Sequence, residues 1–170
     1  WLGAQSQREM RARIGTAYTA EGRDPAQMPL AVQRFMCVTS NKQETIAYVD
    51  NARHQMRLAN ALRRRAEVMD GGMMREVPIP NEITLEEMAA NLLVGDCETI
   101  AQRLCEEIRA SNPCHMMFHF QVGGSAHRDA LNTMEKLMSD IVPMVEREVG
   151  PLAKIGAPIP KAASSAEAVH

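Results

Sequence analysis

The sequence predicts an α/β fold built from strand–helix units. Two apolar segments of strand length, residues 30–38 and 115–122, each run into a segment with helical periodicity. Both are apolar on the two faces, which is typical of strands covered on both sides in parallel sheets. The chain has 170 residues, 45% of them apolar, so it has room for one domain.

Composition excludes several classes of function. The formal charge is −2, so no basic surface is expected to attract nucleic acid or an anionic membrane. No window approaches the roughly 18 apolar residues that a spanning helix needs. The four cysteines show no paired short spacing, so neither a metal site nor a disulfide framework is predicted. A reducing, cytoplasmic location is the expectation.

The elements of the first half follow from local signals. Residues 6–9 (Ser-Gln-Arg-Glu) fit a capping box and predict a helix that ends at Gly22. The β-forming run of residues 30–38 predicts a strand, and residues 39–41 then cap a long helix over about 42–64. Three arginines close that helix, where positive charge suits its carbonyl end.

Residues 66–83 form an irregular, apolar segment that carries Gly71-Gly72, two prolines and several methionines. An apolar loop of this length is more often a lid or a partner contact than a simple linker. Met69, Met73 and Met74 fit an adaptable lid over a hydrophobic substrate or equally a dimer contact. The sequence leaves both alternatives open.

A short helix is predicted over 84–91, after which Gly95 turns the chain. Asp96 then caps a helix of about 97–110, which Pro113 ends. His115 and His119 have the metal-ligand spacing of a helix, but on a strand they lie about 13 Å apart, so a metal site is not expected.

The last elements are a strand over 115–122 and a helix over about 126–148, which Pro143 should kink or break. Residues 151–170, rich in Ala, Pro and Ser, are predicted to be disordered. Two strands cannot make a covered sheet by themselves, and an eight-fold barrel needs about 250 residues. Residues 1–150 are therefore interpreted as the end of such a barrel.

Four segments in order carry a resemblance to a known family. They are Trp1-Leu2-Gly3 before the first helix, Arg34 within the strand, LVGDCETIAQRL at residues 93–104, and Gln121-Val122-Gly123-Gly124 with His127. Up to about residue 152 the chain resembles the C-terminal part of the bacterial luciferase-like, flavin-dependent monooxygenases. The Val-Gly-Asp-x-Glu-Thr stretch recurs in that family before the helix that precedes the final strand.

The resemblance implies a (β/α)8 TIM barrel, incomplete in this chain, whose last two strands are those predicted here. It implies reduced FMN at the C-terminal mouth, a reaction with O2 that oxygenates a small organic substrate, a separate flavin reductase, and a homodimer. Much of the flavin binding in the family comes from the part not present here, so this segment alone should be inactive. The alternatives are an F420-dependent oxidoreductase of the same superfamily and a non-catalytic α/β partner chain.

Arg34 is the strongest candidate for catalysis. Strand alternation places it among apolar neighbours, where an unpaired charge would cost several kcal/mol. In a barrel strand it would point to the mouth, and the sulfonate-oxidising relatives have an arginine at the matching place. Those relatives carry a histidine two residues later, where this chain has Met36, so sulfonate specificity is not carried over. The alternative is a structural ion pair.

The other candidates lie around the second strand and at the edges of the predicted pocket. Gln121, Gly123 and Gly124 are expected to contact the flavin, since a glycine turn before a helix exposes backbone donors. His127 is a candidate proton carrier, or else a plain loop residue. The expected apolar walls are Trp1, beside the flavin, and Met36, Met73 and Met74, beside the substrate.

Overall fold

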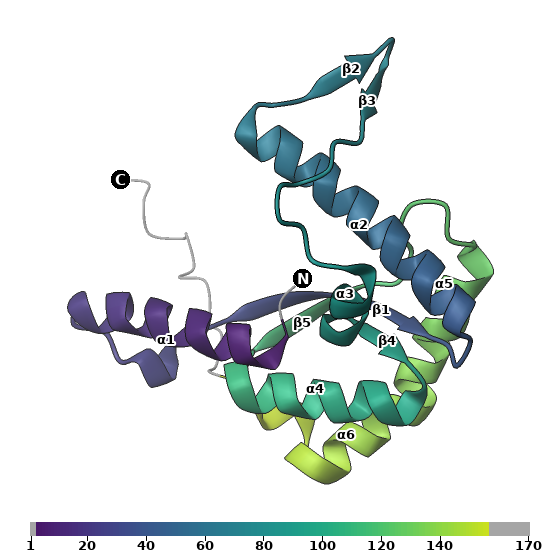
Figure 1. Cartoon of the computed structure of the whole chain (residues 1–170). Coiled ribbons are helices and arrows are strands. Elements are labelled where there is room, and N and C mark those ends of the chain that lie inside the picture. Colours follow the sequence, from purple (N-terminus) through teal and green to yellow (C-terminus); the bar gives the residue numbers. More distant parts are fainter. Residues whose placement is uncertain (1–2, 157–170) are drawn as a thin grey trace, which may run out of the picture.

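The computed structural model describes residues 3–156, and its centre is a parallel sheet of three strands with helices on both faces (Figure 1). Strand β1 (Ala31–Val38) lies between β4 (Leu93–Gly95) and β5 (His115–His119). Met36 to Val38 pair with β4, and Ala31 to Phe35 pair with β5. The predicted α/β class with a parallel sheet is confirmed.

The remaining elements surround this sheet. The helices are α1 (Ala4–Ala20), α2 (Lys42–Arg64), α3 (Leu85–Asn91), α4 (Cys97–Ser111), α5 (His127–Lys136) and α6 (Val142–Val149). A π-helical segment, Leu137–Ile141, joins α5 to α6, and short 3-10 turns occupy Pro25–Gln27 and Leu152–Lys154. A separate antiparallel hairpin consists of β2 (Val68–Asp70) and β3 (Met73–Arg75).

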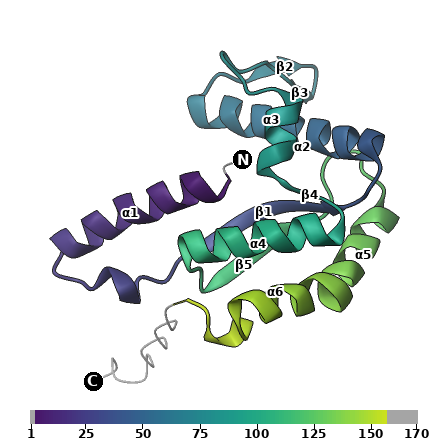
Figure 2. The ribbon, with the colours of Figure 1, turned by 60° about the horizontal axis from the view of Figure 1, so that its bottom comes forward.

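Alternation along β1 divides the core into two layers. Phe35 and Cys37 pack against α2 and α3, whereas Met36 packs against α4, the π-helical segment and α6. Figure 2 shows α4 and α6 on one side of the sheet, with α2 and α3 on the other. Strand β5 is less covered than predicted, because Met117 is exposed.

The order of the strands determines the connections. The chain leaves β1 through α2 to reach β4, and α4 then carries it past β1 to β5. The sequence predicted only a turn at Gly95, because a strand as short as β4 has too few residues for a periodic signal. Consecutive strands of a barrel are neighbours, whereas β4 and β5 are separated by β1. Within residues 3–156 the sheet is open.

Local capping signals explain most helix boundaries. Asn41 accepts hydrogen bonds from the backbone of Gln43 and Glu44, and Asp96 accepts one from Thr99, as predicted. The capping box expected at residues 6–9 is wrong, because α1 already begins at Ala4 after Gly3. Gln5 Nε2 instead donates to Glu9 within the helix.

The C-terminal part confirms one expectation and corrects another. The predicted break near Pro143 is present: the helix passes through its π-helical segment just before this proline, whose ring nitrogen cannot donate. Residues 151–156, predicted to be disordered, are ordered: the Leu152 amide donates to Glu146 and the Gly156 amide to Asn112, both at 3.0 Å. Residues 157–170 lie outside the described part.

Candidate functional site

A crevice opens where β1 and β5 end. Helix α2, which follows β1, packs on the Phe35 face of the sheet, and α5, which follows β5, packs on the opposite face. Open α/β sheets bind ligands at such a point, beyond the carboxyl ends of strands whose connections diverge. A cavity of about 210 Å³ lies here, lined by Cys37, Val38, Glu44, Ala47, Tyr48, Asn51, Phe120, Gly124, Ser125, Asp129 and Asn132.

The charged side chains that line this crevice are acidic. Glu44 and Asp129 contribute carboxylates, Asn51 and Asn132 contribute amides, and no Lys or Arg lines the cavity. The Thr39 hydroxyl donates to Glu44 Oε2 at 2.5 Å, which orients that carboxylate. Such a lining suits a cationic ligand or an uncharged one rich in hydrogen-bonding groups, and it repels phosphate.

Asn51 holds the glycine turn that forms one wall. Its Oδ1 accepts a hydrogen bond from the Gly124 amide at 3.3 Å. Gly123 has a φ of +52°, and a Cβ atom at that position would lie 2.5 Å from Asn51 Oδ1. Both the left-handed backbone and the close approach of Asn51 require glycine at 123. The Gly124 donor, expected to contact the flavin, is therefore engaged by a side chain.

Gln121 and His127 meet beside this turn. The Gln121 amide donates to the Ser125 carbonyl at 3.2 Å, and Gln121 Oε1 lies 3.4 Å from His127 Nδ1. The Ser125 hydroxyl accepts from the Val122 amide at 3.0 Å and closes the turn. Both Gln121 and His127 are exposed, so their polar groups are accessible to a ligand.

Two buried groups form the floor of the crevice. Burial is the main cause that raises the pKa of Cys37 to about 11, and the nearby Asp129 carboxylate adds to it. Burial also raises the pKa of Tyr48, whose hydroxyl donates to the His119 carbonyl at 2.6 Å. Cys37 is therefore a neutral thiol near pH 7, not a nucleophile, and Tyr48 fixes the end of β5 against α2.

Arg34 does not line this crevice. Its side chain is 2% exposed and points toward α4, where Nη2 lies 2.7 Å from Glu107 Oε1 and also donates to the Asn91 carbonyl. Even-numbered residues of β1 face the α4 layer, whereas the crevice lies between α2 and α5. The alternative of a structural ion pair holds, with a helix as the partner.

The predicted apolar walls also lie elsewhere. Met36 is fully buried in the core under α4, so it cannot contact a substrate in the crevice. Met73 and Met74 belong to β3, which stands at the far end of α2, away from the sheet (Figure 1). Trp1 lies outside the described residues. No cluster of metal-ligating side chains occurs within residues 3–156, where all four cysteines are free.

Sequence reasoning missed the α2 and α5 side of the crevice. Glu44, Tyr48 and Asn51 recur at helical spacing on one face of α2, directly after a strand end, and Asp129 and Asn132 do so on α5. A search for polar residues in the first turns after each buried strand would have found them. Only the packing reveals that the two faces meet.

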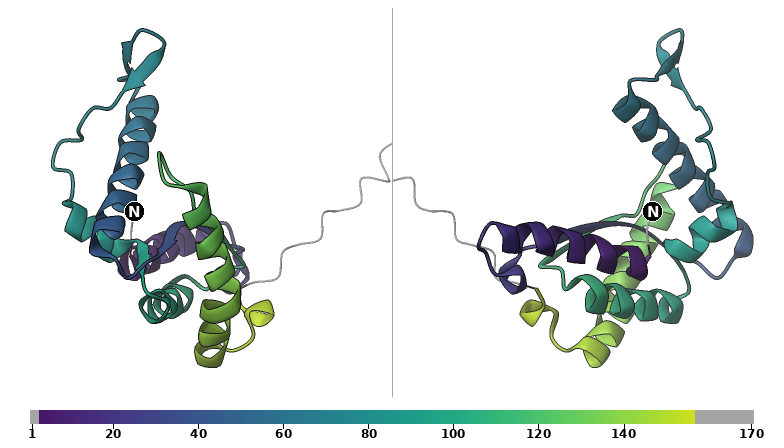
Figure 3. Two further views of the ribbon diagram at one scale, coloured as in Figure 1. Left: turned by 90° about the vertical axis from the view of Figure 1, so that its right-hand side faces the viewer. Right: turned by 60° about the vertical axis from the view of Figure 1, so that its left-hand side comes forward.

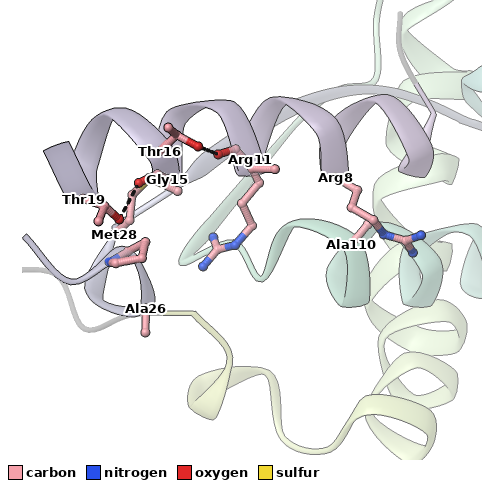
Figure 4. Close-up of a pocket in the computed structure, with 10 residues that line it drawn as sticks. Arg8, Arg11, Gly15, Thr16, Thr19, Ala26, Met28 and Ala110 are labelled. Atoms are coloured by element: carbon pink, nitrogen blue, oxygen red, sulfur yellow. Dashed lines mark hydrogen bonds between the residues drawn. The ribbon is translucent and has the colours of Figure 1, made fainter.

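A larger groove of about 540 Å³ lies between α1 and the turn that follows it (Figure 4). Its Thr16 and Thr19 hydroxyls donate to carbonyls of their own helix, and Arg11 Nη1 donates to the Ser111 carbonyl at 2.7 Å. These three groups are engaged within the protein. The crevice lies instead at the carboxyl ends of parallel strands, where α/β proteins bind ligands, and is therefore the better candidate site.

The fold is an α/β one with a crevice at the carboxyl edge of its parallel sheet. No family model matches the chain. An uncharacterized protein, y4vJ of Sinorhizobium fredii (strain NBRC 101917 / NGR234), is 30% identical over 142 residues. The match covers 83% of this chain and 40% of that protein, so the chain spans well under half of this relative. Within the described residues, no helix has the length and apolar character to cross a bilayer.

Proposed function

We propose that the crevice binds a small organic substrate beside a flavin ring. The chain would then be the C-terminal part of a luciferase-like, flavin-dependent monooxygenase that uses reduced FMN and O2. The observation that carries the proposal is that Gln121 and His127 meet on the turn whose Gly124 and Ser125 line the crevice, which is also lined by Glu44 and Asp129 from the helices that follow β1 and β5. The sequence resemblance supplies the chemistry, and the location agrees with where α/β enzymes bind ligands.

The residues of the crevice fit only part of FMN. The Gln121 amide and the His127 imidazole suit the carbonyl and N–H edge of an uncharged ring. The phosphate does not fit, because Glu44 and Asp129 would repel it and the Gly124 amide already donates to Asn51. We therefore assign phosphate binding to other parts of a longer protein and derive no chemical step through the flavin.

Within this proposal the chain positions groups around the substrate. Gln121 holds His127 by its Oε1 and is itself held by the Ser125 carbonyl, so the imidazole has a defined orientation. His127 can then exchange a proton with a bound substrate. Asn51 maintains the turn that carries both groups.

The finer fold, a (β/α)8 barrel, belongs to the same proposal. The parallel pairing of β1 with β5 supports it, as does the outer edge of β5, which has no strand beside it within residues 3–156. A barrel strand carries helices on one face alone, whereas in residues 3–156 α2 and α3 also cover the Phe35 face of the sheet. The proposal also includes a cytoplasmic location and a separate reductase. The crevice would receive the reduced flavin that this reductase produces.

Anaerobic titration of the intact protein with reduced FMN tests this function. We expect saturable binding, weakened about tenfold or more by Gln121→Ala and by His127→Ala, since each removes a polar contact worth about 1–2 kcal/mol. Arg128→Ala, an exposed neighbour on α5, is the matched control and should bind as wild type. Absence of binding, or equal binding by all variants, would overturn the proposal.

Turnover separates the remaining alternatives. O2 consumption with reduced FMN and a reductase supports the monooxygenase, whereas hydride exchange with F420 without O2 supports the deazaflavin enzyme. A protein that binds neither cofactor is the non-catalytic partner. In each case Gln121→Ala and His127→Ala must reduce the activity that is measured, and Arg128→Ala must leave it unchanged.

A further inference from the structure

Strand β5 ends in an imidazole that does not line the crevice. His119 is the last residue of the strand and pairs in register with Phe35 on β1. The rings of these two residues stack, so His119 lies on the face of the sheet that α2 covers in part. Figure 3 shows α2 leaving the sheet on that side. Gln121, already placed in the candidate site, follows two residues later.

Three contacts hold His119 in a defined position. The ring centroids of Phe35 and His119 lie 5.0 Å apart, with 27° between the ring planes. The amide nitrogen of Gln33, which precedes Phe35 by two residues on β1, contacts His119 Nε2. The Tyr48 hydroxyl donates to the His119 carbonyl at 2.6 Å and fixes the backbone at the strand end. The backbone, the ring plane and one ring nitrogen are therefore all restrained.

The contact with Gln33 also determines which ring nitrogen carries the proton. An amide nitrogen can only donate, so Nε2 of the neutral His119 ring accepts. The proton of that ring is then on Nδ1. Within residues 3–156, Nδ1 of His119 has no hydrogen-bond partner. The ring therefore offers one oriented N–H donor.

The surface around this donor is open to a ligand. Helices α2 and α3 cover Phe35, but Gln33, earlier on the same face of β1, is exposed. On β5, Met117 is 53% exposed and His119 itself is partly exposed. In an extended chain, residues two apart are separated by about 6.5–7 Å, which is within the length of a small fused ring system. One ring can therefore contact both His119 and Gln121.

We propose that His119 is a further ligand-binding residue of the site, which donates from Nδ1 to a carbonyl oxygen of the flavin ring beside Gln121. Gln33 and Phe35 are its positioning residues. The inference rests on the proposed function. A single N–H donor recognises an uncharged acceptor without the help of a basic side chain, and a donor that is already oriented loses little freedom when the ligand binds.

Nitrogen-15 NMR of the imidazoles in the intact protein tests the position of the proton, at about pH 8, where imidazole is mostly neutral. We expect the wild-type His119 ring to carry its proton on Nδ1. Gln33→Glu replaces the donor by a carboxylate, which only accepts, and should place a proton on Nε2. His115, exposed at the other end of β5, is the control and should give the same signals in both proteins. A wild-type His119 ring protonated on Nε2 would overturn the proposal.

Anaerobic titration of the intact protein with reduced lumiflavin tests the contact with the ligand, because lumiflavin has the flavin ring but no phosphate. His119→Phe keeps a flat ring against Phe35 but removes the donor, and it should weaken binding roughly tenfold. Gln33→Glu should weaken binding as well, since it moves the donor to the nitrogen that faces residue 33. His115→Phe is the matched control on the same strand and should bind as wild type.

The outcomes distinguish this inference from the proposed function. Weaker binding by His119→Phe and Gln33→Glu, with His115→Phe unchanged, supports the contact. If Gln121→Ala weakens binding and His119→Phe does not, the role of His119 is wrong and the proposed function is unaffected. If the wild-type protein does not bind lumiflavin, both are wrong.

Discussion

Arg34 on β1 and Glu107 on α4 form an ion pair inside the protein, with Nη2 and Oε1 2.7 Å apart and both side chains at most 3% exposed. Burial raises the pKa of Glu107, although the Arg34 guanidinium opposes this shift. The Nε of Arg34 and the Oε2 of Glu107 have no partner among the described residues, so the pair is not fully satisfied. It joins the sheet to its helix layer without a large net gain in stability.

Removal of one partner should be much more harmful than removal of both. Arg34→Met leaves a buried, unpaired carboxylate and should lower the free energy of unfolding by about 3–5 kcal/mol. Arg34→Met with Glu107→Leu removes both charges and should regain most of that loss. Urea unfolding of the three proteins provides the measurement. A double variant less stable than Arg34→Met would contradict this account of the pair.

The glycine turn of the crevice permits a matched pair of substitutions. Gly123→Ala forces a side chain into a left-handed backbone and against Asn51, and should cost about 1–3 kcal/mol of stability. Gly124→Ala meets open space and should stay within about 0.5 kcal/mol of wild type. Thermal unfolding measures both. Equal effects would indicate that Asn51 does not pack against the turn.

The contact of Glu76 with His54 and Arg57, which ties the end of the β2–β3 hairpin to α2, should depend on pH. A hydrogen bond from His54, with the Arg57 guanidinium, lowers the pKa of Glu76 below its usual 4.5. The stabilisation that the Glu76 contact provides is therefore complete above pH 4.5, and it is lost as the pH falls through the lowered pKa of Glu76. Hydrogen exchange of residues 68–75 should accelerate in that window. In the Glu76→Gln variant, the amides of residues 68–75 should exchange faster at neutral pH and should lose most of this pH dependence. Unchanged protection of these amides would mean that the Glu76 contact does not hold the hairpin.

Cys37 should be unreactive in the native protein. With a pKa of about 11, roughly 0.1% of the thiol is ionised at pH 8, and burial blocks access as well. Mass spectrometry after treatment with iodoacetamide should find Cys37 unmodified in buffer and fully modified in denaturant. Rapid modification in buffer would mean that the crevice opens far more readily than its packing indicates.

The sequence predicted the elements whose signals are local. Side chains within a few residues of each boundary predict three of these elements. They are the strand at 30–38, the helix capped by Asn41 and the helix capped by Asp96. Gln121 and His127 meet because they lie close in sequence on either side of one turn. The break near Pro143 could be predicted from the sequence because proline cannot donate a backbone hydrogen bond.

The tertiary structure alone decided which distant residues meet. Asn51 reaches a turn 73 residues away, and the acidic faces of α2 and α5 converge only because their strands pair. Arg34 was assigned to the pocket because alternation identifies a face but not which helix layer covers that face. Hydrogen bonds within helices and caps span a few residues and are encoded locally, whereas contacts between layers depend on the order in which strands assemble.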